Sequence, residues 1–259
     1  MPEVLRILIF ILLIPFLIST GCKARIKGNS TDRLNSAGGK DPIPEQLRDA
    51  YRHDAAALAI RDLNAGLTEP VSVADIPREA YENHYKRLGI LYAFLQKENL
   101  PDLSGIHIDK KPDLKSVIVT IAPDAKFRER WMKGFTSTEN LYLNQLIAKY
   151  DIEIKDYSEA SGAPQVRLLS PENINTTEFA RLLRGVSGIR GAETIDGKTG
   201  GNNIRSNKKP GGEYAISLIR GHGICKPECE FQTSWNFLIQ AGTKTVTYEG
   251  MTGDPPPAK

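Results

Sequence analysis

The chain lacks most of the features from which a biochemical activity can be inferred directly. Its net charge is only +3, which is too small to indicate a nucleic-acid-binding surface. It has no internal repeat and no hydrophobic run long enough to span a bilayer. The HExxH, EF-hand and GxSxG motifs of metalloproteases, calcium-binding proteins and hydrolases are also missing. These absences leave a protein of ordinary globular composition, 40% hydrophobic and 25% charged.

Cysteine is scarce, and one of the three cysteines follows an N-terminal signal. Arg6 precedes an apolar run, Ile7–Ile18, that is roughly half as long as a membrane-spanning helix requires. The small residues Ser19–Gly21 lie directly before Cys22. This segment resembles the lipobox signals of bacterial lipoproteins. The resemblance implies that residues 1–21 are removed and that Cys22 carries the acyl chains of a membrane anchor. An ordinary secretory signal with a chance cysteine, or an uncleaved anchor, is the alternative.

The rest of the chain divides into a tether, a folded body and a tail. Residues 22–44 are polar and have few apolar groups to bury, so they predict a flexible tether between membrane and body. Residues 45–252 predict a single α+β domain. A sub-boundary in the loop rich in glycine and asparagine at 196–212 is an alternative. The run of three prolines predicts an extended, disordered tail at 253–259.

Inside the body, apolar periodicity predicts helices at 45–63 and 78–96. Residues 116–195 then predict the order strand, helix, strand, strand, helix, strand, which is that of a ferredoxin-like βαββαβ core. Three strands between 214 and 249 predict an antiparallel meander. The predicted fold class is therefore α+β, with the N-terminal helices packed on a mixed or antiparallel sheet.

Local patterns predict further details. Thr136 with Glu139, and Asn175 with Glu178, have the spacing of helix N-caps. Residues 105–109, apolar at their centre, predict a short strand. Each of these predictions depends on only a few neighbouring residues.

The two remaining cysteines, Cys225 and Cys229, leave three interpretations open. In an exported chain one close pair is most simply a disulfide, here joining the ends of two predicted strands. The pair can instead join His222 in a metal site with an open fourth position, although this spacing matches no standard structural zinc site. It can also cycle between redox states, although such pairs usually have two intervening residues rather than three.

The same region carries a second resemblance. A GxGxCxxxC segment followed by WxF, which runs from Gly221 to Phe237, resembles the C-terminal part of uncharacterised envelope lipoproteins of Bacteroidota-type bacteria. The helix around Tyr51, the Gly105–His107 segment and Thr138–Asn140 resemble other parts of these proteins. The acidic residue usual before the first cysteine of the pair is Ile224 here. Because this family has no established activity, the resemblance implies an envelope location and no catalytic residue.

One further motif is best interpreted as a chance match. Residues 192–199 fit a loose version of the phosphate-binding loop, with alanine in place of the first glycine. That loop needs a helix N-terminus behind it, whereas residues 200–203 are two glycines and two asparagines, which break helices.

The sequence therefore predicts an extracytoplasmic lipoprotein of the cell envelope that acts as a non-catalytic binding or assembly module. We expect no cofactor and no nucleic acid. The expected partners are membrane lipid, through acylation of Cys22, and another envelope protein.

The alternative is an envelope enzyme or a metal or thiol site. A metal or thiol site would be centred on His222, Cys225 and Cys229, and an enzyme site would bring His222 together with Arg220 and the Asn202–Asn203 loop. A pocket that collects these side chains would favour the enzyme, and an exposed apolar patch without such a pocket would favour the binding module.

The anchoring hypothesis predicts the outcome of a labelling experiment. Cells that produce the full chain and are fed an alkyne-tagged fatty acid should label the wild type, whereas Cys22→Ala should not be labelled, because it lacks the acylated sulfur. In-gel fluorescence after click chemistry measures this difference. Equal labelling of the two proteins would remove the anchor.

Overall fold

The computed structural model describes residues 41–66, 74–108, 112–160, 163–196, 201–225, 229–240 and 242–255. The expected signal at 1–21, Cys22 and the tether as far as Lys40 lie outside these residues. Within them the chain is α+β, as predicted, and none of the helices is both long and apolar enough to cross a bilayer. The helices are α1 Glu45–Ala65, α2 Arg78–Lys97, the 3₁₀ helix η2 Pro101–Gly105, α3 Arg128–Met132, α4 Leu141–Lys149 and α5 Thr176–Arg184. The strands are β1 Pro112–Ile121, β2 Glu153–Ala160, β3 Ala163–Leu169, β4 Ile189–Asp196, β5 Asn203–Lys208, β6 Tyr214–Cys225, β7 Cys229–Ile239 and β8 Val246–Gly253.

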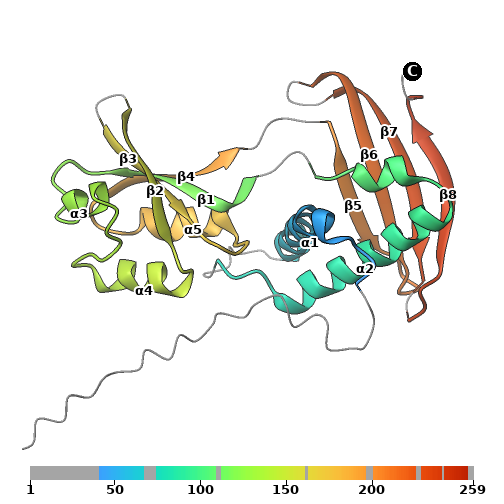
Figure 1. Cartoon of the computed structure of the whole chain (residues 1–259), viewed down its shortest axis with the longest axis horizontal. Coiled ribbons are helices and arrows are strands. Elements are labelled where there is room, and N and C mark those ends of the chain that lie inside the picture. Colours follow the sequence, from blue (N-terminus) through green and yellow to red (C-terminus); the bar gives the residue numbers. More distant parts are fainter. Residues whose placement is uncertain are drawn as a thin grey trace, which may run out of the picture. The chain divides into compact units, whose positions relative to one another are not determined.

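The first sheet confirms the ferredoxin-like core. Its strand order is β2-β3-β1-β4 and all neighbouring strands are antiparallel. With α3 and α4 between β1 and β2, and α5 between β3 and β4, this is the split βαβ arrangement. In Figure 1, α4 and α5 lie on the same side of this sheet. The largest buried side chains here are Trp131 and Phe179, packed with the apolar residues of β1 and β3.

Asparagine side chains cap the first turns of α4 and α5. The side chain of Asn175 accepts a hydrogen bond from the backbone N–H of Glu178 at 3.3 Å, which confirms the predicted cap of α5. The cap predicted at Thr136 is wrong, because α4 begins after Asn140, whose side chain accepts from the N–H of Leu143 at 3.0 Å. Each cap satisfies a backbone donor that the first turn would otherwise leave unpaired.

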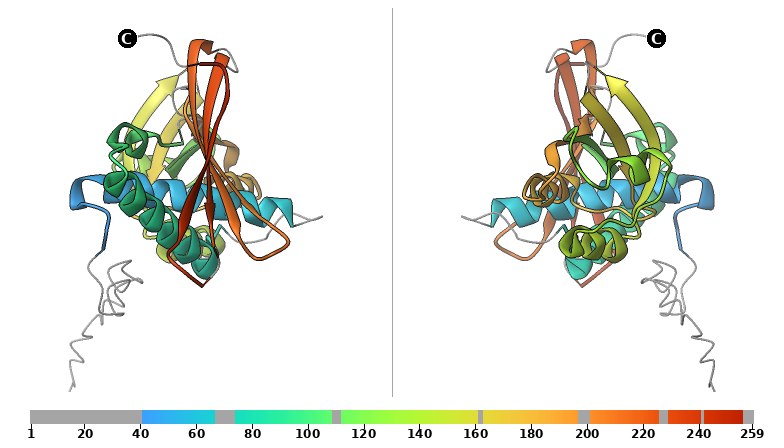
Figure 2. Two further views of the ribbon diagram at one scale, coloured as in Figure 1. Left: turned by 90° about the vertical axis from the view of Figure 1, so that its right-hand side faces the viewer. Right: turned by 90° about the vertical axis from the view of Figure 1, so that its left-hand side faces the viewer.

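The second sheet has the order β5-β6-β7-β8 and is also antiparallel throughout. Helices α1 and α2 lie along it (Figure 1), and the views in Figure 2 show its strong twist. A second hydrophobic cluster joins α1, α2 and η2 to Ile216, Leu218, Phe237 and Ile239 of the sheet. The N-terminal helices therefore pack on the C-terminal strands, and β1–β4 form a separate apolar cluster between them in the chain.

Three predictions of strand position need correction. The loop predicted at 196–212 contains a strand, β5, that pairs along its whole length with β6, so the meander has four strands rather than three. Only Ile204 of this strand is buried, which explains why hydrophobic patterning missed it. The strand predicted at 105–109 is not formed, because Gly105 ends η2 and residues 106–108 belong to neither a helix nor a strand. The last strand runs beyond the expected residue 249 to Gly253.

Because one end of β7 is buried against the helices and the other is not, replacing two of its phenylalanines by alanine should lower the free energy of unfolding by very different amounts. Phe237 is fully buried between Phe94 and Tyr248, so Phe237→Ala should lower the free energy of unfolding by about 3–5 kcal/mol. Phe231 is 47% exposed, and Phe231→Ala should cost less than about 1 kcal/mol. Urea unfolding followed by circular dichroism measures both values. Similar losses would contradict this packing.

Candidate functional site

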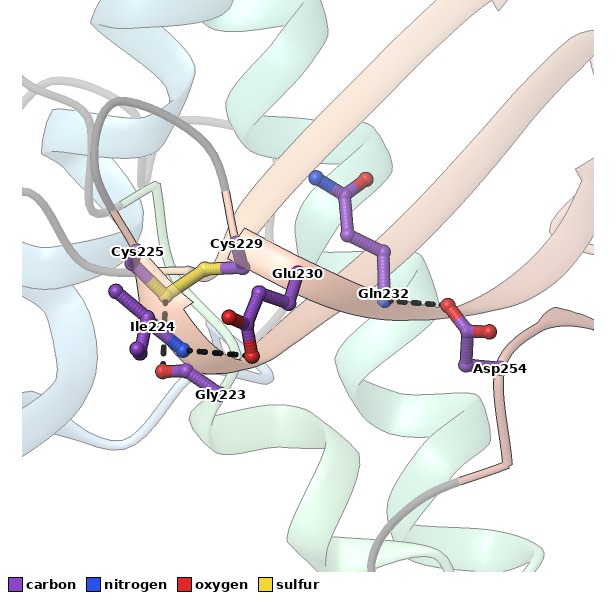
Figure 3. The surroundings of a disulfide bond; sticks show 7 residues. All are labelled: Gly223, Ile224, Cys225, Cys229, Glu230, Gln232 and Asp254. Atoms are coloured by element: carbon purple, nitrogen blue, oxygen red, sulfur yellow. Dashed lines mark hydrogen bonds between the residues drawn. A yellow bond between two sulfur atoms is a disulfide. The ribbon is translucent and has the colours of Figure 1, made fainter.

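The sequence places its candidate site at Cys225 and Cys229, which the structure locates at the tip of the β6–β7 hairpin (Figure 3). The two cysteines are register partners and are joined by a disulfide, as predicted. Both sulfurs are occupied in this state, so neither is a thiolate available to a metal. Across the described ranges, no group of three or more His, Cys, Asp or Glu side chains could hold a metal ion.

Close packing around one sulfur explains the glycines of the GxGxCxxxC segment. A Cβ at Gly221 would come within 2.5 Å of Cys229 Sγ and 2.6 Å of the Cα of Gly201, and a Cβ at Gly201 would collide with the same sulfur. Gly223 has φ +81°, a conformation that disfavours other residues. The glycines are therefore needed to bring β6, the segment before β5 and the disulfide together.

The residues of the alternative enzyme site have separate partners. His222 stacks on Phe231 with 5.5 Å between ring centroids, and an Nη atom of Arg220 donates to the carbonyl of Asp102 in η2 at 3.1 Å. The amide oxygen of Asn203 accepts from Arg61 of α1 at 3.0 Å.

A groove of about 640 Å³ also bears on this alternative. It is lined by α2, by the start of β8 with the two residues before it, and by Asp41 and Pro42, and it contains none of the residues of the proposed enzyme site. This cavity therefore gives no support to an enzyme centred on His222.

Two His–Asp pairs, which the sequence did not reveal, lie elsewhere. His84 Nε2 is 2.8 Å from Asp62 Oδ2, and His84 Nδ1 is 3.0 Å from an Nη atom of Arg87. Because arginine can only donate, Nδ1 accepts and Nε2–H donates to Asp62, so the ring is neutral. Burial lowers the pKa of His84, which agrees with a neutral ring. Arg87 in turn lies over the ring of Tyr214 at 3.7 Å, so this chain of contacts connects α1, α2 and β6.

The second pair joins Asp54 of α1 to His107. The carboxylate is fully buried, lies 2.6 Å from His107 Nδ1, and accepts from the N–H of Ile108 at 2.9 Å. In serine hydrolases such a pair orients a base next to a nucleophile. Here the hydrogen bonds of His107 within the described ranges involve Asp54 alone. The pair therefore holds residues 107–108 against α1. A carboxylate on the apolar face shared with Tyr51 and Leu58 was the sequence signal that could have revealed it.

Of the eight exposed large apolar side chains in the described ranges, four lie on β6–β8, and the others are Met132, Phe135, Leu141 and Tyr142 of the α3–α4 region. Ile224 is 65% exposed, Phe231 47%, Met251 48% and Tyr248 42%. Phe231 alternates along β7 with Trp235 and Phe237, whose register partners on β8 are Met251 and Tyr248. We call Ile224, Phe231, Tyr248 and Met251 the hairpin surface. Phe231, Tyr248 and Met251 thus belong to the strand face that packs against the helices, yet each is still 42–48% exposed. We therefore take the hairpin surface as the candidate binding site.

The packing around Cys229 predicts that a methyl group added at Gly221 lowers the stability of the fold, whereas one added at an open position does not. Gly221→Ala should lower the free energy of unfolding by about 1–3 kcal/mol, because the new Cβ overlaps the disulfide and the facing backbone. Gly211→Ala is the matched control, since a Cβ there meets nothing within 4 Å, and its effect should be below about 1 kcal/mol. Urea unfolding without reductant measures both. An unchanged stability for Gly221→Ala would refute the close approach.

Comparison with protein-family models, curated proteins and solved structures finds no match for this chain. The inference of function therefore depends on the geometry of the hairpin surface and of the groove.

Proposed function

We propose that the protein is a lipid-anchored protein of the bacterial cell envelope that serves as a non-catalytic binding or assembly module. The observation that carries this proposal is the hairpin surface. Four large apolar side chains, each more than 40% exposed, lie on the three neighbouring strands β6, β7 and β8. Large apolar side chains left exposed near one another are typical of sites that bind another molecule, and here they lie on three adjacent strands.

The construction of the hairpin tip supports this role. The disulfide fixes the ends of β6 and β7, and the glycine contacts hold the segment before β5 against them. Phe231 is backed by the stacked ring of His222. A surface held rigid in this way loses little conformational entropy on binding, so more of its apolar contact contributes to affinity.

The envelope location is supported by two independent features of the chain. The first is the lipobox-like sequence that ends at Cys22. The second is the Cys225–Cys229 disulfide, because disulfides persist in oxidising compartments outside the cytosol. Neither feature depends on the binding surface, so location and role can be tested separately.

Site-specific photocrosslinking in living cells tests the binding role. Benzoylphenylalanine at position 231 of the full chain should give a discrete crosslinked product on irradiation, and Ile224→Ser with Met251→Ser should remove that product by weakening the contact. The same photoreactive residue at Phe135, which is 59% exposed on the other sheet unit, is the control and should not give this product.

The products are compared by immunoblot of envelope fractions, and each variant is first shown to unfold at the wild-type urea concentration. A product that forms equally from positions 231 and 135, or that survives the two serine substitutions, would refute a specific site at the hairpin surface.

A further inference from the structure

The groove beside α2 is a second site and shares no residue with the hairpin surface. Its volume of about 640 Å³ lies within the range of pockets that hold small molecules. One wall is formed by α2, and Lys244–Val246 and Asp41–Pro42 complete it. It therefore brings together residues from the beginning and the end of the described chain.

Four of the apolar residues that line the groove, Ile90, Ala93, Phe94 and Val246, are called its floor below. Ile90, Ala93 and Phe94 occupy one stripe of α2, and Val246 contributes from β8. The ring of Phe94 packs edge-on against fully buried Phe237 with 6.1 Å between centroids, which fixes its position. Because the side chain at position 93 is only a methyl group, the middle of the stripe stays open. A floor of this kind suits a hydrocarbon chain.

The charged residues that line the groove, called its rim below, are three lysines and two carboxylates, an excess of one positive charge. Lys86 and Lys97 lie on α2 about 16 Å apart along the helix axis, and Lys244 also lines the groove. Within the described ranges, no carboxylate forms an ion pair with Lys86 or with Lys244, whereas Lys97 lies 3.8 Å from Glu98.

The other acidic group on the rim is already neutralised by its neighbours. Asp41 accepts a hydrogen bond from the hydroxyl of Tyr85 at 2.9 Å and from the N–H of Ile43 at 3.0 Å, and it lies 3.3 Å from Arg48. Among the described residues that line the groove, Lys86 and Lys244 are therefore the charges without an ion-pair partner, and they favour a negative occupant.

The charge of the groove argues against the chain's own tether as the occupant. Residues 23–40, which lead to Asp41, carry only one acidic residue, Asp32. Their basic residues are Lys23, Arg25, Lys27, Arg33 and Lys40. Such a segment is repelled by a lysine-rich rim.

We propose that this groove binds a single-chain anionic amphiphile, with the acyl chain along Ile90–Phe94 and the acidic headgroup held by Lys86 and Lys244. The shared chemistry is one hydrocarbon chain with a carboxylate or a phosphate. The chain gains free energy by leaving water, and the headgroup gains it from charge-assisted hydrogen bonds to the lysines.

A photoreactive, alkyne-tagged oleate tests this proposal on the full chain in isolated membranes. Irradiation should label the α2 peptide that contains Ile90–Phe94, as read by mass spectrometry after enrichment. Excess unlabelled oleate or oleoyl-lysophosphatidate should suppress the labelling, and the stronger competitor identifies the headgroup. Monooleoylglycerol, which has the same chain and no charge, should compete at least fivefold less well.

Two kinds of variant test the contributions of the apolar floor and of the charged rim separately. Ala93→Trp fills the groove, and Lys86→Glu with Lys244→Glu reverses the charge, so each should lower labelling of α2 at least fivefold. The matched control is Lys133→Glu with Lys209→Glu, which reverses two exposed lysines elsewhere and should keep wild-type labelling. The lysine variant also tests the proposal if Ala93→Trp fails to fold.

The proposal would be overturned if α2 is not labelled, or if both variants keep wild-type labelling. It would also be overturned if monooleoylglycerol suppresses the labelling as well as oleate does. This result is independent of the anchor and of the hairpin surface. A chain that is not acylated at Cys22 still contains the groove, and loss of a crosslink at position 231 does not change it.

Discussion

The structure depends on the burial of one sheet face, that of β5–β8, by helices from the other end of the chain. Ile216, Leu218, Phe237 and Ile239 are almost fully buried against α1, α2 and η2, although the whole β1–β4 unit lies between them in the sequence. Both candidate sites follow from where that coverage ends. The strand face continues past the helices to Phe231 and becomes the hairpin surface. The uncovered stripe of α2 meets the start of β8 and becomes the groove.

Buried polar groups fix how α1 and α2 lie on this sheet. Arg61 donates to the carbonyl of Ile204 at 2.7 Å, which connects α1 to the edge strand β5. His84, held between Asp62 and Arg87, connects the two helices to each other. Apolar packing alone tolerates small shifts of a helix, whereas a buried polar group that loses its partner costs about 1–3 kcal/mol. The contacts of His84 here, and those of His107 with Asp54, are therefore best understood as parts of the framework.

Local sequence signals predicted several features correctly but not all, since the cap at Thr136 and the strand at 105–109 were also predicted from neighbouring residues and are wrong. The ferredoxin-like core, the cap at Asn175 and the disulfide could be predicted, because periodicity, capping spacing and cysteine spacing each involve neighbouring residues. Strand β5 escaped prediction because it is a polar edge strand with one buried side chain, Ile204. The Asp54–His107 pair joins residues far apart in sequence, and the groove combines Asp41 with Val246, so no local pattern could bring these groups together.

At the hairpin tip, the disulfide contributes little to stability and more to the position of the exposed side chains. Closing so short a loop is worth only about 2 kcal/mol in the chain-entropy treatment, and the strands are already paired along most of their length. Its larger effect is on position, because it holds Ile224 and Phe231 at the end of a twisted sheet that would otherwise fray. The glycines at 201 and 221 also help to fix this position, because they let the backbone pack tightly around the sulfur of Cys229. An unusual concentration of steric constraints beside exposed apolar side chains is expected where a protein presents a preformed surface to a partner.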